Sequence, residues 1–324
     1  MDWSDKSVLV TGGTGSFGKM FVRQLLHIQK PRRIIVFSRD ELKQHEMRQT
    51  LDDESLRYFI GDVRDKDRLY RAFNGVDIVV HAAALKQVPA CEYNPIEAIM
   101  TNVMGARNII DAALDNGVSK VLALSTDKAV NPINLYGATK LCAEKLFIHA
   151  NAYSRADETA FSNVRYGNVI GSRGSVIPLF RQQRDAGELT ITHKDMTRFW
   201  ITLEQGVDFV ISCIERMHGG EVFVPKIPSM NIMDLAQAIA PGTPVTFTGI
   251  RSGEKMHEVL ISEDEARHTR DAGDRYVVLP DQHEWWITSP DAIGQALTDE
   301  FSYTSRNNDE WLTIAQLQDL ANRV

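Results

Sequence analysis

The chain has 324 residues, of which 43% are hydrophobic, and its 36 Lys and Arg against 43 Asp and Glu give a net charge of −7. This length can build one large core with a smaller appended lobe, and the acidic balance provides no broad basic surface for nucleic acid or an anionic membrane. No run of eighteen apolar residues occurs and the first residues are acidic, so we expect a cytoplasmic protein.

The first predicted element is a strand that enters a glycine-rich turn and then a helix. The apolar residues 8–10 are followed by Thr-Gly-Gly-Thr-Gly-Ser-Phe-Gly at 11–18 and by a helical pattern of apolar residues. Such a turn lets the backbone approach a pyrophosphate at the helix N-terminus. The order strand, turn, helix predicts a dinucleotide site with contacts from Gly12, Thr14, Gly15, Ser16, Phe17 and Gly18.

The second predicted strand, 33–37, ends where the adenosine ribose of a dinucleotide is expected. Ser38, Arg39, Asp40 and Lys43 follow it. An acidic side chain favours a free 2′-hydroxyl, whereas Arg39 with Lys43 suits a 2′-phosphate. The pattern favours NADP over NAD, and the alternative is that Arg39 is a solvated loop charge.

The third and fourth predicted strands, 58–63 and 76–81, place further residues at the cofactor. Asp62 and Val63 would meet the adenine, and the small residues 82–84 would let a flat cofactor lie close, although they also suit close helix packing. We predict contacts from Ala82, Ala84 and Lys86, the last to cofactor or sugar. Strands that alternate with helices predict an α/β fold: a Rossmann-type doubly wound parallel sheet.

The segment 125–140 carries the predicted catalytic residues. Tyr136 and Lys140 are four residues apart, so on a helix they share a face, and we expect the ammonium to lower the pKa of the phenol. Thr126 follows the apolar run 121–124 and would bridge the phenol and a substrate oxygen, while Asp127 and Lys128 add an acid and a base. The alternative is that Asp127 is a structural cap and Lys128 a surface charge.

The second half predicts a smaller α/β substrate-binding lobe. We expect residues 1–166 to form the cofactor domain, with a returning helix near 203–218, and residues 167–202 and 219–324 to form mainly the lobe and a C-terminal tail. Candidate short strands in the lobe are 188–192 and 221–224, and the tryptophans at 285 and 286 are expected to pack.

A nucleotide diphosphate needs cations, and Arg173, Arg198 and Arg251 are the candidates, although single arginines are often solvated. Cys91, Cys142 and Cys213 have no C-x-x-C spacing, and the histidines form no ligand motif. We therefore predict no disulfide framework and no metal site.

These motifs resemble the extended short-chain dehydrogenase/reductase superfamily. More narrowly, the chain resembles the inverting UDP-N-acetylglucosamine 4,6-dehydratases of the PseB type. The resemblance covers about Ser7 to Leu260, and its most specific part is Thr-Asp-Lys at 126–128. It is carried by the segments 84–89, 92–95, 101–103, 125–140 and 165–169.

The resemblance implies tightly bound NADP recycled within each turnover, a UDP-sugar substrate and a homo-oligomer. It implies that Arg251 contacts the pyrophosphate and Glu254 the uridine ribose, and it adds Asn168 and Val169 to the substrate residues. The product would be UDP-2-acetamido-2,6-dideoxy-β-L-arabino-hex-4-ulose, the first intermediate of pseudaminic acid-type sugar synthesis.

The expected mechanism begins with oxidation, because carbon 5 is acidic only beside a ketone. Tyr136 takes the 4-hydroxyl proton beside Lys140 and Thr126; neutral Lys128 then removes the carbon-5 proton, and protonated Asp127 assists departure of the 6-hydroxyl. We expect burial to shift the pKa of both Asp127 and Lys128 in the required direction. The alternatives are a nucleotide-sugar 4-epimerase or 4-reductase, and a non-catalytic NADP-binding regulator.

Overall fold

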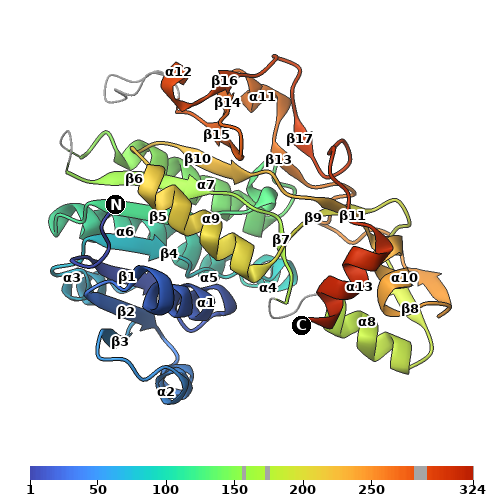
Figure 1. Cartoon of the computed structure of the whole chain (residues 1–324), viewed down its shortest axis with the longest axis horizontal. Coiled ribbons are helices and arrows are strands. Elements are labelled where there is room, and N and C mark those ends of the chain that lie inside the picture. The colour runs from blue at the N-terminus through green and yellow to red at the C-terminus, as the bar shows by residue number, and fades with distance from the viewer. Residues whose placement is uncertain (155–157, 172–175, 281–289, 324) are drawn as a thin grey trace.

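The computed structural model describes residues 1–154, 158–171, 176–280 and 290–323, arranged as a large α/β body and a smaller lobe (Figure 1). Within these residues the largest sheet has ten strands. In spatial order they are β16 (Gln295–Ala296), β14 (Thr269–Asp271), β15 (Arg275–Val278), β10 (Val222–Pro225), β6 (Ala160–Val164), β5 (Lys120–Leu124), β4 (Ile78–His81), β1 (Ser7–Thr11), β2 (Arg33–Ser38) and β3 (Leu56–Ile60).

The strands from β10 to β3 are parallel, and β14, β15 and β16 extend the sheet by antiparallel pairs. The order of connection reverses between β1 and β4, since β1 pairs with β2 on one side and with β4 on the other. Ligands of doubly wound sheets bind outside the carboxyl ends of the strands at such a reversal. The predicted α/β fold with a doubly wound, mainly parallel sheet is confirmed.

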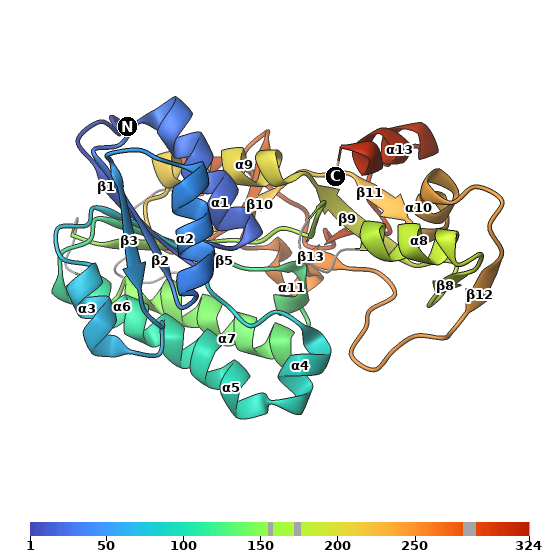
Figure 2. The same ribbon diagram turned by 90° about the horizontal axis from the view of Figure 1, so that it is seen from below.

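Helices cover both faces of this sheet, because its central strands are apolar throughout and need cover on each side. Figure 2 shows α1 and α9 on one face and α6 and α7 on the other. Each face has its own buried apolar cluster, one built around Phe21 and Val207 and the other around Ile109 and Phe147. The helices of the body are α1 (Ser16–Gln24), α2 (Glu41–Thr50), α3 (Lys66–Ala72), α4 (Val88–Tyr93), α5 (Pro95–Ile99), α6 (Gly105–Asp115), α7 (Leu135–Ala150) and α9 (Leu203–Arg216).

Short π-helical turns continue two of these helices, at Leu25–Gln29 and at Met100–Met104. A single 3₁₀ turn, η3 (Asp127–Ala129), follows β5. Helix α9 begins with a capping box at Thr202 and packs against α1 and β5. The chain therefore returns to the sheet after it has entered the smaller lobe.

The smaller lobe has short strands and helices around a third apolar cluster that includes Phe180, Trp200 and Leu235. Strand β9 lies between β7 and β11, and β8 pairs with β12. The elements of the whole chain not given above, in the lobe and beside the large sheet, are β7 (Asn168–Val169), α8 (Val176–Asp185), β8 (Leu189–Ile191), β9 (Thr197–Ile201), β11 (Ser229–Asn231), α10 (Ile232–Ile239), β12 (Val245–Phe247), β13 (Val259–Ile261), α11 (Glu263–Ala266), α12 (Pro290–Ile293), β17 (Tyr303–Thr304) and α13 (Ile314–Asn322).

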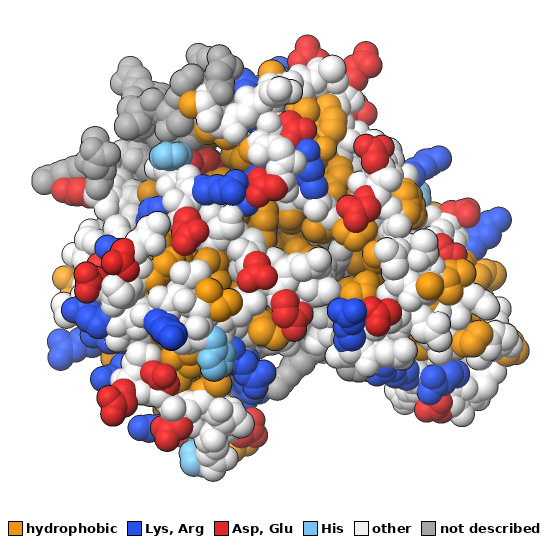
Figure 3. All heavy atoms as spheres, in the orientation of Figure 1, with side chains coloured by type: hydrophobic (Ala, Val, Ile, Leu, Met, Phe, Trp, Pro, Cys, Tyr) orange, Lys and Arg blue, Asp and Glu red, His pale blue; other side chains and the backbone are white. Residues whose placement is uncertain are grey.

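One predicted strand lies elsewhere. Residues 221–224 were expected in the smaller lobe, but β10 pairs with β6 and β15 in the large sheet. All four residues of β10 are buried, which its short apolar sequence permits in either place. The tryptophans at 285 and 286 lie outside the described residues. On the face of the molecule in Figure 3, side chains of both charges are interspersed.

Candidate active site

One cavity of about 870 Å³ lies at the carboxyl ends of the central strands and extends toward the smaller lobe. Every residue predicted to bind the cofactor lines it. These are Gly12, Thr14, Gly15, Ser16, Phe17, Gly18, Ser38, Arg39, Asp40, Lys43, Asp62, Val63, Ala82, Ala84, Lys86, Tyr136 and Lys140. The cavity continues past residues that the sequence did not indicate, among them Gln87, Thr101, Tyr166 and Trp200.

The glycine turn has the shape that a dinucleotide needs. Gly12 has a φ of +67°, and a Cβ there would lie 2.9 Å from the backbone nitrogen of Ala83. Helix α1 begins after Gly15, which has no side chain to cap it. The first amides of the helix are therefore left for an anion such as a pyrophosphate.

The expected ribose end of the cavity is lined by two cations and two carboxylates that are paired with one another. The Asp40 carboxylate caps α2 by accepting a hydrogen bond of 3.0 Å from the Lys43 amide, and it also contacts the Lys43 ammonium. These hydrogen bonds lower the pKa of Asp40. Arg39 is more than half exposed, and its guanidinium lies 3.5 Å from Asp62, whose carboxylate also binds Arg64 at 2.8 Å.

Lys140 and Tyr136 project from the first turns of α7 into the cavity, but their electrostatics differ from the expectation. Burial lowers the pKa of Lys140 to about 8, and its ammonium donates a hydrogen bond of 2.5 Å to the Leu124 carbonyl. Burial raises the pKa of Tyr136 to about 12, and the cation that opposes this rise is Lys128. The expected effect of Lys140 on the phenol is therefore corrected: in this structure Lys128 has that effect.

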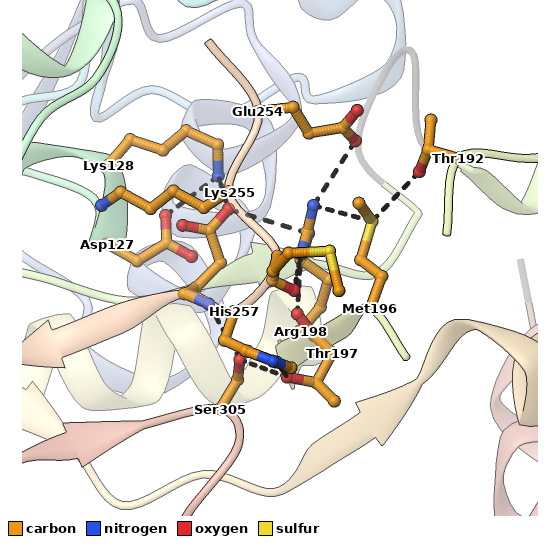
Figure 4. A network of polar contacts seen from close by, with 12 residues as sticks. Asp127, Lys128, Thr192, Met196, Thr197, Arg198, Glu254, Lys255, His257 and Ser305 are labelled. Carbon is orange, nitrogen blue, oxygen red and sulfur yellow. Dashed lines mark hydrogen bonds and ion pairs between the residues drawn. The ribbon is translucent and has the colours of Figure 1, made fainter. Parts of the chain in front are cut away.

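Thr126, Asp127 and Lys128 lie at the end of β5, where η3 turns the chain toward α7. Asp127 is fully buried, and its Oδ1 accepts a hydrogen bond of 2.9 Å from the Thr126 hydroxyl. The same oxygen accepts a hydrogen bond of 3.0 Å from Lys128 Nζ (Figure 4). Gly137 makes this packing possible, because a Cβ there would lie 2.1 Å from the Lys128 carbonyl oxygen. Lys128 is thus partly buried, at 26% exposure, and paired with Asp127.

A buried carboxylate that the sequence analysis missed completes this group. Glu258, just before β13, lies 3.2 Å from Lys128 Nζ and 3.7 Å from Arg198 Nε. Burial and the charge of Glu258 raise the pKa of Asp127, as expected. The pKa of Lys128 is raised, not lowered, because Asp127 and Glu258 outweigh its burial, so the expectation of a burial-neutralised Lys128 is wrong.

The predicted substrate residues divide into two groups. Lys86, Asn168, Val169 and Glu254 line the cavity. Arg198 is buried under it, where its guanidinium donates to the Thr197 carbonyl at 2.7 Å and lies 3.4 Å from Glu254 (Figure 4). Arg251 is exposed and does not line the cavity, and Arg173 lies outside the described residues. Arg198 is therefore occupied by protein groups, and this structure does not bring Arg251 to the cavity.

In the described part of the chain, no group of three or more His, Cys, Asp and Glu side chains is placed to hold a metal ion. The three cysteines are unpaired thiols, two of them buried. No helix among the described residues has the length and apolar character to span a membrane.

Comparisons with known proteins place this site in a family. A family model described as polysaccharide biosynthesis protein matches residues 8–280. The UDP-N-acetylglucosamine 4,6-dehydratase (inverting) of Campylobacter jejuni subsp. jejuni serotype O:23/36 is 52% identical to this chain, and the alignment covers 99% of each of the two chains. The UDP-glucose 4-epimerase of Rickettsia prowazekii is 43% identical, with 98% of this chain and 95% of that protein covered.

Solved structures agree with this relationship. Pen from Bacillus thuringiensis has a TM-score of 0.90 at 36% identity, with 100% of this chain and 98% of that chain covered. DesIV, a dTDP-glucose 4,6-dehydratase from Streptomyces venezuelae with NAD bound, has a TM-score of 0.69 at 25% identity, with 77% and 86% covered. The chain therefore belongs to the polysaccharide biosynthesis protein family and is related within it to the inverting UDP-N-acetylglucosamine 4,6-dehydratases, as its motifs predicted.

Proposed function

We propose that the protein is a hydro-lyase that removes water across carbons 4 to 6 of UDP-N-acetylglucosamine and inverts carbon 5. The product would be UDP-2-acetamido-2,6-dideoxy-β-L-arabino-hex-4-ulose, which would enter pseudaminic acid-type sugar synthesis. The observation that carries the proposal is the Asp127–Lys128 pair, in which buried Asp127 Oδ1 lies 3.0 Å from Lys128 Nζ, beside the Tyr136 phenol at one cavity. A relative named as this dehydratase, 52% identical over 99% of the chain, supports it.

The oxidation step uses the residues at the start of α7. Tyr136 accepts the proton of the sugar 4-hydroxyl, and Thr126 orients the oxygen of that hydroxyl. The Lys140 ammonium lines the cofactor side of the cavity. A bound nicotinamide cofactor supplies the hydride acceptor at carbon 4, the hydride donor at carbon 6 and a positive charge beside the phenol. That charge is needed because burial raises the pKa of Tyr136 to about 12 even though Lys128 opposes the rise.

The elimination step uses Lys128 and Asp127 as one unit. Moving one proton along their 3.0 Å hydrogen bond turns an ammonium and a carboxylate into an amine and a carboxylic acid, with no change in net charge. Asp127 and Glu258 favour the ammonium form of Lys128, so the neutral pair is the less populated form, and it is the form that reacts. Lys128 then accepts the carbon-5 proton, and Asp127 gives its proton to the departing 6-hydroxyl, which leaves as water.

For the cofactor we propose NADP. Arg39, Asp40 and Lys43 all line the expected ribose end of the cavity, where Asp40 caps α2 and contacts Lys43, and the Arg39 side chain is 55% exposed. A guanidinium and an ammonium suit a 2′-phosphate better than a free hydroxyl. The solved DesIV structure has NAD bound, so the choice of NADP rests on these side chains of the present chain.

A homo-oligomer is also proposed. Large apolar side chains remain exposed along α4, α5 and the π turn after them: Tyr93 at 87%, Ile96 at 65%, Ile99 at 37% and Met100 at 40%. An exposed apolar patch of this kind is typical of a contact between proteins.

The second candidate is a 4-epimerase, favoured by the 43% identical relative named UDP-glucose 4-epimerase. An epimerase uses Tyr136 and Lys140 but requires neither loss of water nor an acid–base pair at carbons 5 and 6. The test is to incubate the protein with UDP-N-acetylglucosamine and measure the product mass. Loss of one water supports the dehydratase, and an isomer of unchanged mass supports the epimerase.

A further inference from the structure

Glu258 reaches the acid–base pair from a distant part of the chain. It precedes β13, about 130 residues after Lys128, and its side chain is 3% exposed. Its backbone is fixed by Ser305, whose hydroxyl accepts a hydrogen bond of 2.9 Å from the Glu258 amide and whose own amide donates 2.8 Å to the Glu258 carbonyl. These two hydrogen bonds to Ser305 therefore fix the backbone from which the Glu258 carboxylate extends.

Lys128 lies between two buried carboxylates. Its Nζ is 3.0 Å from Asp127 Oδ1 and 3.2 Å from Glu258 Oε1, so both are within ion-pair distance of one ammonium. Two carboxylates that share a site do not ionise independently, because each charge disfavours the other. One of them is better placed to hold the negative charge.

Glu258 is the better placed of the two. The cations that face it are Lys128, Arg198 and Lys255, and together they lower its pKa. Asp127 faces Glu258, Lys128 and the Tyr136 phenol, and its pKa is raised. Of the two carboxylates, Asp127 is therefore the one that takes the proton transferred from Lys128, while Glu258 stays ionised.

The unpaired oxygen atoms agree with this assignment. Within the described part of the chain, Asp127 Oδ2 is buried without a hydrogen-bond partner, while Oδ1 accepts two hydrogen bonds. A bare oxygen in the interior costs more on an ionised carboxylate than on a neutral carboxylic acid. The Oε2 atom of Glu258 is also bare, but its carboxylate has Lys128 and Arg198 to balance its charge.

We propose that Glu258 is a positioning residue for the Asp127–Lys128 pair: it holds the Lys128 ammonium, and its negative charge sets the pH range in which the pair exchanges protons with the sugar. This inference rests on the proposed dehydration. The side of the cavity that carries Glu254 would thus also influence the proton transfers at carbons 5 and 6.

The test is the pH dependence of product formation by the holoenzyme with UDP-N-acetylglucosamine, for the unaltered protein and for Glu258→Gln. Removing one negative charge lowers the pKa of both the ammonium and the carboxyl group beside it. Both limbs of the pH profile are therefore expected to move to lower pH by about one unit. Carbon-5 exchange with deuterated water at the original optimum is expected to fall roughly tenfold to hundredfold.

Two further variants separate this role from a general structural one. Glu263→Gln removes an exposed carboxylate from the neighbouring α11 and should leave the profile unmoved. Glu258→Asp keeps the charge but withdraws it from Lys128, so its profile should move in the same direction by less. If Glu258→Gln does not fold, Glu258→Asp alone decides, and an unmoved profile overturns the proposal.

A second readout is the single-turnover reduction of bound cofactor by the substrate, which requires Tyr136 but not the carbon-5 proton transfer. Glu258→Gln should retain it. Equal loss of both half-reactions with an unmoved pH profile overturns the role of Glu258 alone. Failure of the unaltered protein to dehydrate the sugar overturns the proposed function, and the role of Glu258 with it.

Discussion

In the proposed mechanism Lys128 is the residue that distinguishes a dehydratase from an epimerase, and its replacement tests this directly. Lys128→Met removes the base but leaves Tyr136 and Lys140. We expect a loss of at least about 100-fold in carbon-5 deuterium exchange and in product, with reduction of bound cofactor retained. Lys194→Met, at an exposed position in the smaller lobe, is the matched control. Equal loss of both half-reactions in Lys128→Met would contradict the assigned role.

Arg39 is the residue that we expect to select the cofactor. Its side chain is 55% exposed and lies at the cavity, so its removal costs little stability. Arg39→Ala should weaken NADP binding by about tenfold to hundredfold and change NAD binding by less than about threefold, because only NADP offers a 2′-phosphate. Calorimetric titration measures both, with the exposed Arg48→Ala on α2 as control. Equal weakening of both cofactors would refute this selection.

His81 gives the folded protein a defined response to acid. It is buried, its Nδ1 lies 2.8 Å from the Thr11 hydroxyl, and burial lowers its pKa from 6.5 to about 3. The unfolded chain therefore binds a proton that the folded one does not, and the stability present above pH 6.5 is lost as pH falls toward 3. The contribution is roughly 5 kcal/mol, at about 1.4 kcal/mol per pKa unit.

His81→Asn, which has no titrating group, should show a flatter loss of stability between pH 6.5 and 3 in denaturant titrations. The variant is expected to be less stable near neutral pH, so the slopes are compared and not the absolute values. Parallel curves for the two proteins would mean that His81 is not the group responsible.

At the scale of elements, the approach of α7 to η3 fixes the active site. A Cβ at Gly137 would lie 2.1 Å from the Lys128 carbonyl oxygen, so Gly137→Ala must move one element away from the other. We expect a loss of roughly 1 to 3 kcal/mol in unfolding free energy and a larger fall in carbon-5 exchange than in cofactor reduction.

The matched control is Gly206→Ala on α9. A Cβ there meets only Ile201 Cδ1 at 4.0 Å, so this variant should be neutral or more stable by up to about 1 kcal/mol. Thermal unfolding and the two half-reactions can be measured on the same samples. Equal stability of the two variants would show that α7 and η3 are not tightly opposed.

The elements that the sequence predicted best are those whose signals are local. The glycine turn at 11–18 and the Tyr136–Lys140 pair depend on residues within a few positions, and the predicted cofactor residues all line one cavity. Residues 221–224 illustrate the limit, because an apolar run of this length fits a buried strand in either part of the molecule. Its partners, β6 and β15, are distant in sequence.

Electrostatics at the site could not be predicted for the same reason. The raised pKa of Lys128 depends on Glu258, and the occupied guanidinium of Arg198 depends on Glu254 and Glu258, which approach from a separate segment. The only signal of these contacts in the sequence was the presence of two acidic residues, 254 and 258, near Lys255. Nothing local distinguished Glu258 from a solvated charge.

For the whole molecule, the exposed apolar side chains of α4 and α5 predict self-association. Ile96→Glu, at a side chain that is 65% exposed, should lower the molar mass measured by sedimentation while leaving the unfolding temperature of the subunit nearly unchanged. Leu179→Glu on α8, at 42% exposure, is the control and should not alter the mass. A mass unaffected by Ile96→Glu would place any subunit contact elsewhere.

The site joins both parts of the molecule, since Lys128 and Tyr136 come from the large sheet domain while Ile177 and Trp200 of the smaller lobe also line the cavity. The chemistry therefore requires the two parts to remain apposed. A cofactor that is oxidised and reduced within one turnover also needs no external reductant, which can be tested on the protein with its bound cofactor alone.

The most direct measurement is an NMR analysis of the product formed from UDP-N-acetylglucosamine in deuterated water without added nicotinamide. We predict a 4-keto-6-deoxy sugar with deuterium at carbon 5 and an L-configured ring. A product epimerised at carbon 4 with its 6-hydroxyl retained, or a ketone without deuterium at carbon 5, would contradict the assignment of Asp127 and Lys128 as the acid–base pair.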